Sequence, residues 1–199
     1  LPEMPSSSPG DLPLTEIRLI PRYPAPSPLT DIMALVPPGS DEYVSEKYAR
    51  EIETILDHWS HALRDSPDQL VFIASFLDPE ISGTATGSFA ETPLRSRSGI
   101  EVVRRSFAES VSGREAFTRS LRTWLQDAAA IQTAEFEIFA IEAVASSPLV
   151  VRTRLRYDIV LRRQDRHREE RVGSWQIEWV RDKSGAWTAR NWEASPETC

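Results

Sequence analysis

The stretches LVVRTRLRYDIVLRR (residues 149–163) and GSWQIEWV (residues 173–180) decide the fold class of this 199-residue chain. Apolar and polar residues alternate along both of them. Successive side chains of a β-strand point to opposite faces of the sheet, so the alternation predicts two strands with one buried face. Tyr157 and Trp175 belong to the apolar faces, whereas Arg154 and Glu178 belong to the polar faces.

The period of two continues on both sides of these stretches, and the residues before them have the helical period of 3.6. Three long strands are predicted, at about residues 134–145, 149–163 and 168–181, followed by a shorter one at 186–194. Three helices are predicted, at residues 40–64, from the capping box at Ser66 to residue 77, and from the capping box at Ser112 to about residue 128. Two shorter strands, 81–86 and 99–104, are predicted between the second and third helices. Helices followed by a meander indicate an α+β domain with its helices on one face of an antiparallel sheet.

The register between the two central strands is predicted from parity and charge. Both apolar faces must meet the helices, so paired residues must share a face. Pairing Tyr157 with Trp175 satisfies this condition and sets opposite charges across the outer face, each pair worth roughly 0.2–1 kcal/mol. The predicted charge pairs are Arg154 with Glu178 and Arg162 with Glu170.

Extending this register to the neighbouring strands predicts an aromatic inner face with a few polar groups. Trp187 is expected beside Trp179, Asn191 beside Trp175, and Glu137 next to Tyr157. Aromatic walls with a few convergent polar groups are typical of a small-molecule pocket. The residues expected to line it are Trp59, Tyr157, Trp175, Trp179 and Asn191. A filled core whose polar atoms satisfy one another is the alternative interpretation.

The element order and the ending GSWQIEWV, a turn at Gly185, AWT and NWEA resemble the nuclear transport factor two-like superfamily over residues 41–194. This superfamily includes ketosteroid isomerase, the SnoaL-like polyketide cyclases and scytalone dehydratase. The resemblance implies a cone-shaped, cystatin-like curved sheet that encloses a pocket with the helices. It also implies a homodimer through the outer sheet face. The chain lacks the Tyr and Asp placement of the isomerase and the Asp-Arg-Asp set of the epoxide hydrolases of this fold.

Three functions stay open at this point, because one fold hosts many functions. The leading hypothesis is a non-catalytic binding or interaction domain with a small apolar ligand. The second is an acid/base enzyme of isomerase, cyclase or dehydratase type, with Glu137 as the base and Tyr157 stabilising an oxyanion. The third is a structural module that orients a neighbouring domain. The composition also resembles N-terminal domains of repeat-rich bacterial proteins, which implies a periplasmic or extracytoplasmic location.

Composition argues against several other classes. The formal net charge of −7 disfavours general binding to nucleic acid, and the Arg-rich hairpin is interleaved with acids. The sequence contains no run of 18 apolar residues, so it predicts no membrane-spanning helix. The single Cys199 rules out an internal disulfide or a thiolate cluster. His58 and His61 have a metal-binding spacing but fall off the apolar stripe of their helix, so neither a metal nor a cofactor is expected.

Proline divides the chain. Ten of the fifteen prolines lie in residues 1–39. Because proline lacks a backbone donor and has a fixed φ, this segment is predicted to be an extended arm or linker. Residues 40–194 are predicted to form a single α+β domain, and residues 195–199 a tail.

Overall fold

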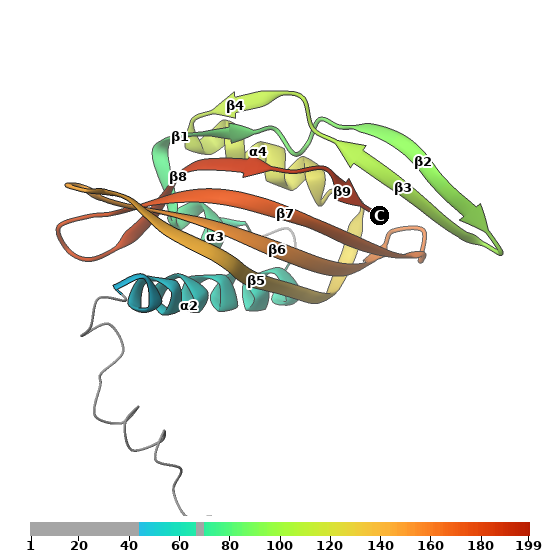
Figure 1. Ribbon diagram of the computed structural model, residues 1–199. Coiled ribbons are helices and arrows are strands. Elements are labelled where there is room, and N and C mark those ends of the chain that lie inside the picture. The colour runs from blue at the N-terminus through green and yellow to red at the C-terminus, as the bar shows by residue number, and fades with distance from the viewer. Residues whose placement is uncertain (1–43, 67–69) are drawn as a thin grey trace, which may run out of the picture. The chain divides into compact units, whose positions relative to one another are not determined.

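The computed structural model describes residues 44–66 and 70–199 (Figure 1). The predicted Pro-rich arm, the start of the first predicted helix and residues 67–69 of the second capping box lie outside the described residues. Within the described ranges, no helix is long and apolar enough to cross a membrane.

Three helices are present in the described part: α2 (Val44–Asp65), α3 (Val71–Ser75) and α4 (Arg114–Trp124). Helix α2 buries a stripe at helical spacing that includes Ile52, Leu56 and Trp59, as the sequence predicted. Helix α4 ends four residues before its predicted end. Its N-cap is Gly113 and no side chain caps it, so the capping box predicted at Ser112 is wrong.

Nine strands form one sheet in the described ranges. They are β1 (Leu77–Thr84), β2 (Ala90–Arg97), β3 (Ile100–Ser106), β4 (Ser110–Ser112), β5 (Ala128–Ser146), β6 (Leu149–Arg163), β7 (Arg168–Arg181), β8 (Trp187–Ala194) and β9 (Glu197–Thr198). The predicted bounds of β6 and β7 are confirmed, whereas β2, β4 and β9 were not predicted. The residues predicted to be a tail form β9, which pairs with β3 on one side and β7 on the other.

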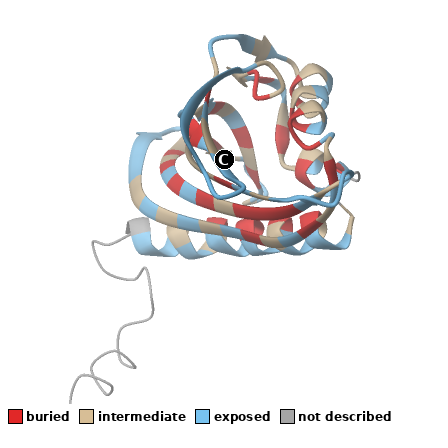
Figure 2. Ribbon diagram, turned by 90° about the vertical axis from the view of Figure 1, so that its right-hand side faces the viewer, coloured by how far each residue is buried: buried red, intermediate tan, exposed pale blue. Residues whose placement is uncertain are grey.

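The sheet curls around a buried interior, and α2 lies along its β5 side (Figures 1 and 2). The α+β class with a curved sheet and helices is therefore confirmed. One pairing departs from the predicted antiparallel pattern, because β1 and β8 run parallel. Figure 2 also shows that the last residue of the chain lies in the opening of the curled sheet.

The register predicted between β6 and β7 is wrong by two residues, although its parity is right. Tyr157 pairs with Gly173, and Trp175 pairs with Leu155. Two features explain the shift. A tight turn closes the hairpin, with Arg166 at φ 71° and Arg163 N–H donating to the His167 carbonyl at 2.8 Å. In addition, a glycine opposite Tyr157 leaves room for its ring.

The predicted charge pairs change with this register. Glu178 accepts hydrogen bonds from Arg152 at 2.6 and 3.1 Å instead of pairing with Arg154. Arg162 lies opposite Arg168 and not opposite Glu170. A second acid, Glu142 of β5, completes the Arg152 cluster at 2.7 Å. The outer face is nevertheless salt-bridged, because the polar residues of both strands stay on it.

Strand β8 contains an irregularity that the alternation did not reveal. Its register against β7 shifts by one residue between the pairs Trp179–Ala189 and Glu178–Asn191. A one-residue bulge turns the following side chains to the opposite face. Trp192 consequently enters the core and Asn191 leaves it. The expected neighbours Trp187 and Trp179 are not paired either, since Trp187 lies opposite Arg181.

Strand β5 bends in the same way, with register shifts at four points along its length. Phe136 pairs with Tyr157 and packs on the core, so the neighbouring Glu137 points outward, is exposed and lies opposite Arg156. A further shift after Ile138 leaves Phe139 57% exposed. The prediction that Glu137 lies next to Tyr157 on the inner face is therefore wrong.

Candidate functional site

The structure brings four of the five predicted ligand-binding residues together and excludes the fifth. Trp59, Tyr157, Trp175 and Trp179 are all at most 3% exposed and belong to one core cluster. Trp59 lies 5.6 Å from Trp179, and Tyr157 lies 4.4 Å from Trp175, between ring centroids. Asn191 is outside this cluster, where its amide donates to Glu193 at 3.3 Å. Trp192 takes the inward position and stacks on Trp59 at 5.3 Å.

The apolar interior beneath the sheet is almost filled. Its void measures about 10 Å³, which is close to the least volume that holds one water molecule. The lining residues are Trp59, Leu63, Leu70, Ile73, Leu121, Trp124, Leu125, Phe136, Trp175 and Trp192. The indole N–H groups of three of them, Trp59, Trp175 and Trp192, are buried and have no acceptor among the described residues. Since buried donors are normally paired, these three N–H groups are an unusual feature of a filled core.

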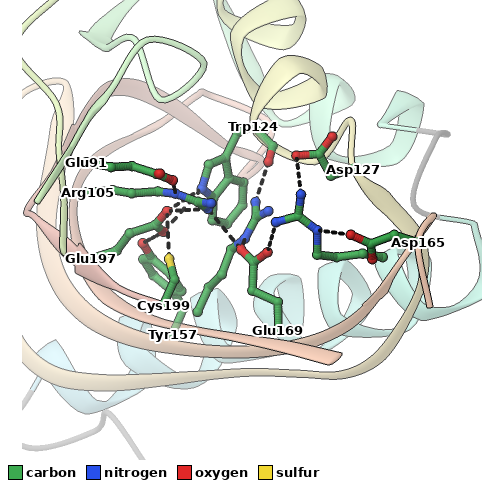
Figure 3. Close-up of polar contacts among 11 residues, drawn as sticks. Glu91, Arg105, Trp124, Asp127, Tyr157, Asp165, Glu169, Glu197 and Cys199 are labelled. Atoms are coloured by element: carbon green, nitrogen blue, oxygen red, sulfur yellow. Dashed lines mark hydrogen bonds and ion pairs between the residues drawn. The ribbon is translucent and has the colours of Figure 1, made fainter. Parts of the chain in front are cut away.

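Glu197 of β9 lies at the centre of a network of hydrogen bonds and ion pairs, and its side chain is fully buried (Figure 3). Its carboxylate accepts a hydrogen bond from the Tyr157 hydroxyl at 2.6 Å. The Trp124 indole N–H donates to both of its oxygens, at 3.1 and 3.2 Å, and Arg105 approaches it at 3.5 Å. Burial, followed by the charge of Glu197, raises the pKa of Tyr157 well above its ordinary value. The hydroxyl therefore stays protonated and acts as a donor to the carboxylate.

A second carboxylate, Glu169 of β7, whose side chain is 9% exposed, binds three guanidinium groups beside this site. One oxygen accepts from Arg171 at 2.6 Å and from Arg105 at 3.0 Å, and the other accepts from Arg163 at 2.8 Å. Burial opposes the charge of Glu169, but the three arginines outweigh it and lower the pKa of this carboxyl below its ordinary value. Arg105 links the two carboxylates and also donates to Glu91 of β2 at 2.8 Å.

A cleft of about 450 Å³ opens next to this network, a volume within the range of small-molecule sites. Its walls come from the β2–β3 hairpin and from the turn between β6 and β7. The lining residues are Glu91, Gly99, Glu101, Val103, Arg105, Arg163, Asp165, His167, Arg168, Glu169 and Cys199. Arg105 and Cys199 join the cleft to the Glu197 network, because Cys199 Sγ lies 3.7 Å from the Glu197 carboxylate. The cleft is charged and mixed in sign, unlike the apolar pocket that the sequence predicted.

No group of three or more His, Cys, Asp or Glu side chains in the described ranges is arranged to hold a metal. His61 contacts the Asp57 carbonyl at 2.7 Å on the exposed face of α2, and His58 packs edge-on against Phe72. Sequence reasoning missed Arg105, Trp124 and Glu197, which make the polar centre. Trp124 lies on the buried apolar face of α4, and a two-residue strand gives Glu197 no periodic signal.

Comparison with known proteins supports the fold alone. No family model and no curated protein matches the chain. A putative scytalone dehydratase from Novosphingobium aromaticivorans superposes with a TM-score of 0.54 at 15% identity, covering 76% of this chain and 86% of that one. The described domain has the nuclear transport factor two-like fold.

Two further structures agree with this assignment. A conserved protein from Planctomyces limnophilus gives a TM-score of 0.52 at 18% identity, covering 75% of this chain and 98% of that one. A protein from Catenulispora acidiphila gives a TM-score of 0.54 at 16% identity, covering 78% of this chain and 95% of that one. Because one fold can host many functions, the function of this chain must be argued from its own site.

Proposed function

We propose that the domain binds a small organic molecule at the opening of its curled sheet. The observation that carries this proposal is the 450 Å³ cleft, which ends on a buried network of donors and carboxylates. The rings of two members of this network, Trp124 and Tyr157, pack with Trp175 in the aromatic core, with ring centroids 4.4–5.7 Å apart. A cleft with polar groups near its entrance and aromatic rings below it suits an amphipathic ligand.

Binding without catalysis is favoured over an acid/base enzyme. The enzyme hypothesis required Glu137 as a base on the inner face, and Glu137 is exposed on the outer face. It also required the Tyr157 hydroxyl to stabilise an oxyanion, but this hydroxyl already donates to Glu197. Exposed side chains that line the cleft, among them Glu101, His167 and Arg168, can orient a ligand through hydrogen bonds.

A ligand screen tests this proposal. Amphipathic and apolar metabolites at about 1 mM are expected to raise Tm, since a ligand that binds only the folded state stabilises it. They are also expected to change tryptophan fluorescence, because Trp124 and Trp175 lie beneath the site. Val103→Trp places a large side chain in the cleft and should weaken binding at least ~10-fold.

The matched control for that substitution is Val144→Trp, at a position of β5 that is 46% exposed and does not line the cleft. It should leave affinity unchanged. Equal affinity in both variants, or no response to any compound, would contradict the proposal and leave the structural role as the better account.

We also propose that the domain forms a homodimer through the outer face of β5 and β6. Exposed acids on β5, Glu135 and Glu137, lie beside exposed cations on β6, Arg154 and Arg156. A two-fold axis between the strands would set the acids of one copy against the arginines of the other. Phe139, which is 57% exposed between these charges, would supply apolar contact area.

A further inference from the structure

We infer that segment 195–199 occupies the ligand site as an internal competitor, and that the ligand is a small aromatic carboxylic acid whose carboxylate replaces that of Glu197. This inference rests on the proposed binding function and adds the chemical class of ligand and a mode of regulation. Competition here means that either the Glu197 side chain or the external carboxylate holds the same set of donors.

The first argument is that the donors around Glu197 form a complete carboxylate site. The Tyr157 hydroxyl, the Trp124 indole N–H and the Arg105 guanidinium come from β6, α4 and β3, respectively. All three side chains are at most 5% exposed. Charge-assisted bonds of this kind are roughly twice as strong as neutral ones, and three of them from rigid elements define a specific anion site.

The second argument is that the segment holding Glu197 has little else to keep it in place. Ser195, Pro196 and Thr198 are exposed, so Glu197 is the one fully buried side chain between residues 195 and 199. Strand β9 is two residues long. The backbone contacts of segment 195–199 are short ladders to Val172 and to Arg104–Arg105, two hydrogen bonds of 2.9 Å between Val103 and Cys199, and one of 3.0 Å from the Ser195 N–H to the Ser174 carbonyl. Strand β9 lies between β3 and β7, and each of its ladders is only one or two residue pairs long, so fewer backbone bonds must open to release it than for a long strand such as β6.

The third argument is the position of this segment between the cleft and the aromatic interior. Cys199 lines the cleft, whereas Trp124, which donates to Glu197, lines the apolar void. Release of the segment would therefore join the cleft to the ring system of Trp124, Trp175 and Trp192. The unpaired indole N–H groups of Trp175 and Trp192 lie in that interior and could donate to acceptor atoms on the ligand body.

The test uses 1-naphthoate and its uncharged analogue 1-naphthamide, with binding followed by tryptophan fluorescence and calorimetry. Glu197→Ala is expected to bind naphthoate at least ~10-fold more tightly than the wild type, because the competitor is removed and the binding-competent fraction rises. The affinity for naphthamide should rise less than ~3-fold in the same variant. Glu193→Ala, which removes an exposed carboxylate of β8, is the matched control and should leave both affinities unchanged.

A second measurement needs no substitution. Saturating naphthoate should accelerate alkylation of Cys199 in the wild-type protein at least ~10-fold, since the displaced segment exposes the thiol. Naphthamide at equal occupancy should accelerate the alkylation of Cys199 less than naphthoate does. Unchanged alkylation, or Glu197→Ala binding naphthoate no more tightly than the wild type, would overturn the inference.

The two proposals fail in different ways. If neither compound, nor any other of the screened ligands, binds any variant, the binding function itself is wrong. If naphthamide or another neutral ligand binds and Glu197→Ala leaves the preference for naphthoate unchanged, the domain binds ligands but segment 195–199 is a structural strand only. Glu197→Gln keeps the size of the side chain and provides the same comparison if Glu197→Ala fails to fold.

Discussion

Glu169 shows how a single carboxylate that is largely shielded from solvent makes the stability of the domain depend on pH. Its pKa is lowered in the folded state, because the charges and hydrogen bonds of Arg171, Arg105 and Arg163 outweigh the effect of burial. A carboxyl of this kind stabilises the folded state fully above its unfolded-state pKa. The contribution is lost as the pH falls through the folded-state value.

The corresponding prediction concerns Glu169→Gln. At pH 7 this substitution leaves three arginines short of a partner and should lower the free energy of unfolding by about 3 kcal/mol. As the pH falls below the ordinary carboxyl value of 4.5, the unfolded state binds the proton first and the difference begins to shrink; it is lost once the pH passes the lower pKa of Glu169 in the folded state. Urea unfolding at pH 7, 5, 4 and 3 measures this difference in the free energy of unfolding, with the exposed Glu53→Gln on α2 as control. A difference that stays constant with pH would contradict this account.

Cys199 provides a second prediction at the residue scale. Burial, followed by the charge of Glu197, raises the pKa of the Cys199 thiol to about 12. The thiolate is the reactive form, so alkylation by iodoacetamide at pH 8 should be at least ~100-fold slower than for a free cysteine peptide. In 6 M guanidinium chloride the two rates should agree. A native protein that reacts as fast as the peptide would show that segment 195–199 does not stay in the opening of the sheet.

Among the elements, the β6–β7 pair depends on a glycine. A Cβ atom at Gly173 would lie 2.5 Å from Tyr157 Cζ, so Gly173→Ala should force the ring away and break its bond to Glu197. We expect a loss of about 1–3 kcal/mol in the free energy of unfolding, which is typical of overpacking.

The same urea titration on Ser174→Ala provides the comparison for Gly173→Ala. Ser174 is the next residue of β7 and lies on its outer face, where substitutions usually change stability by less than about 0.5 kcal/mol. If both variants unfold at the same urea concentration, Gly173 is not what accommodates the Tyr157 ring.

For the whole molecule, the proposed homodimer predicts a mass in solution of twice 22.5 kDa at micromolar concentration. Reversing both Arg154 and Arg156 to Glu would set like charges across the two-fold axis and should weaken the dimer at least ~10-fold. Light scattering after size-exclusion chromatography measures the mass of the wild type and of the variant. Arg119→Glu, on the exposed face of α4, serves as control. A wild type that is monomeric at these concentrations would rule out the dimer.

The sequence by itself determined which residues face the core along most of the sheet. The strands 149–163 and 168–181, their buried faces and the stripe of α2 all follow from periodicity. The physical reason is that side-chain direction is a local consequence of backbone geometry, so alternation in sequence maps directly onto the two faces. This local pattern was sufficient for the α+β class and for placing Trp59, Tyr157, Trp175 and Trp179 together.

Only the tertiary structure decided the register, the bulge that exchanges Asn191 for Trp192, and the carboxylate site. Glu197 is separated from its donors Tyr157, Trp124 and Arg105 by 40, 73 and 92 residues. A two-residue strand has no measurable period, and a buried charge is stable only where donors from distant elements converge on it. Those donors meet because the sheet curls, which is a property of the assembled fold and not of any short stretch of sequence.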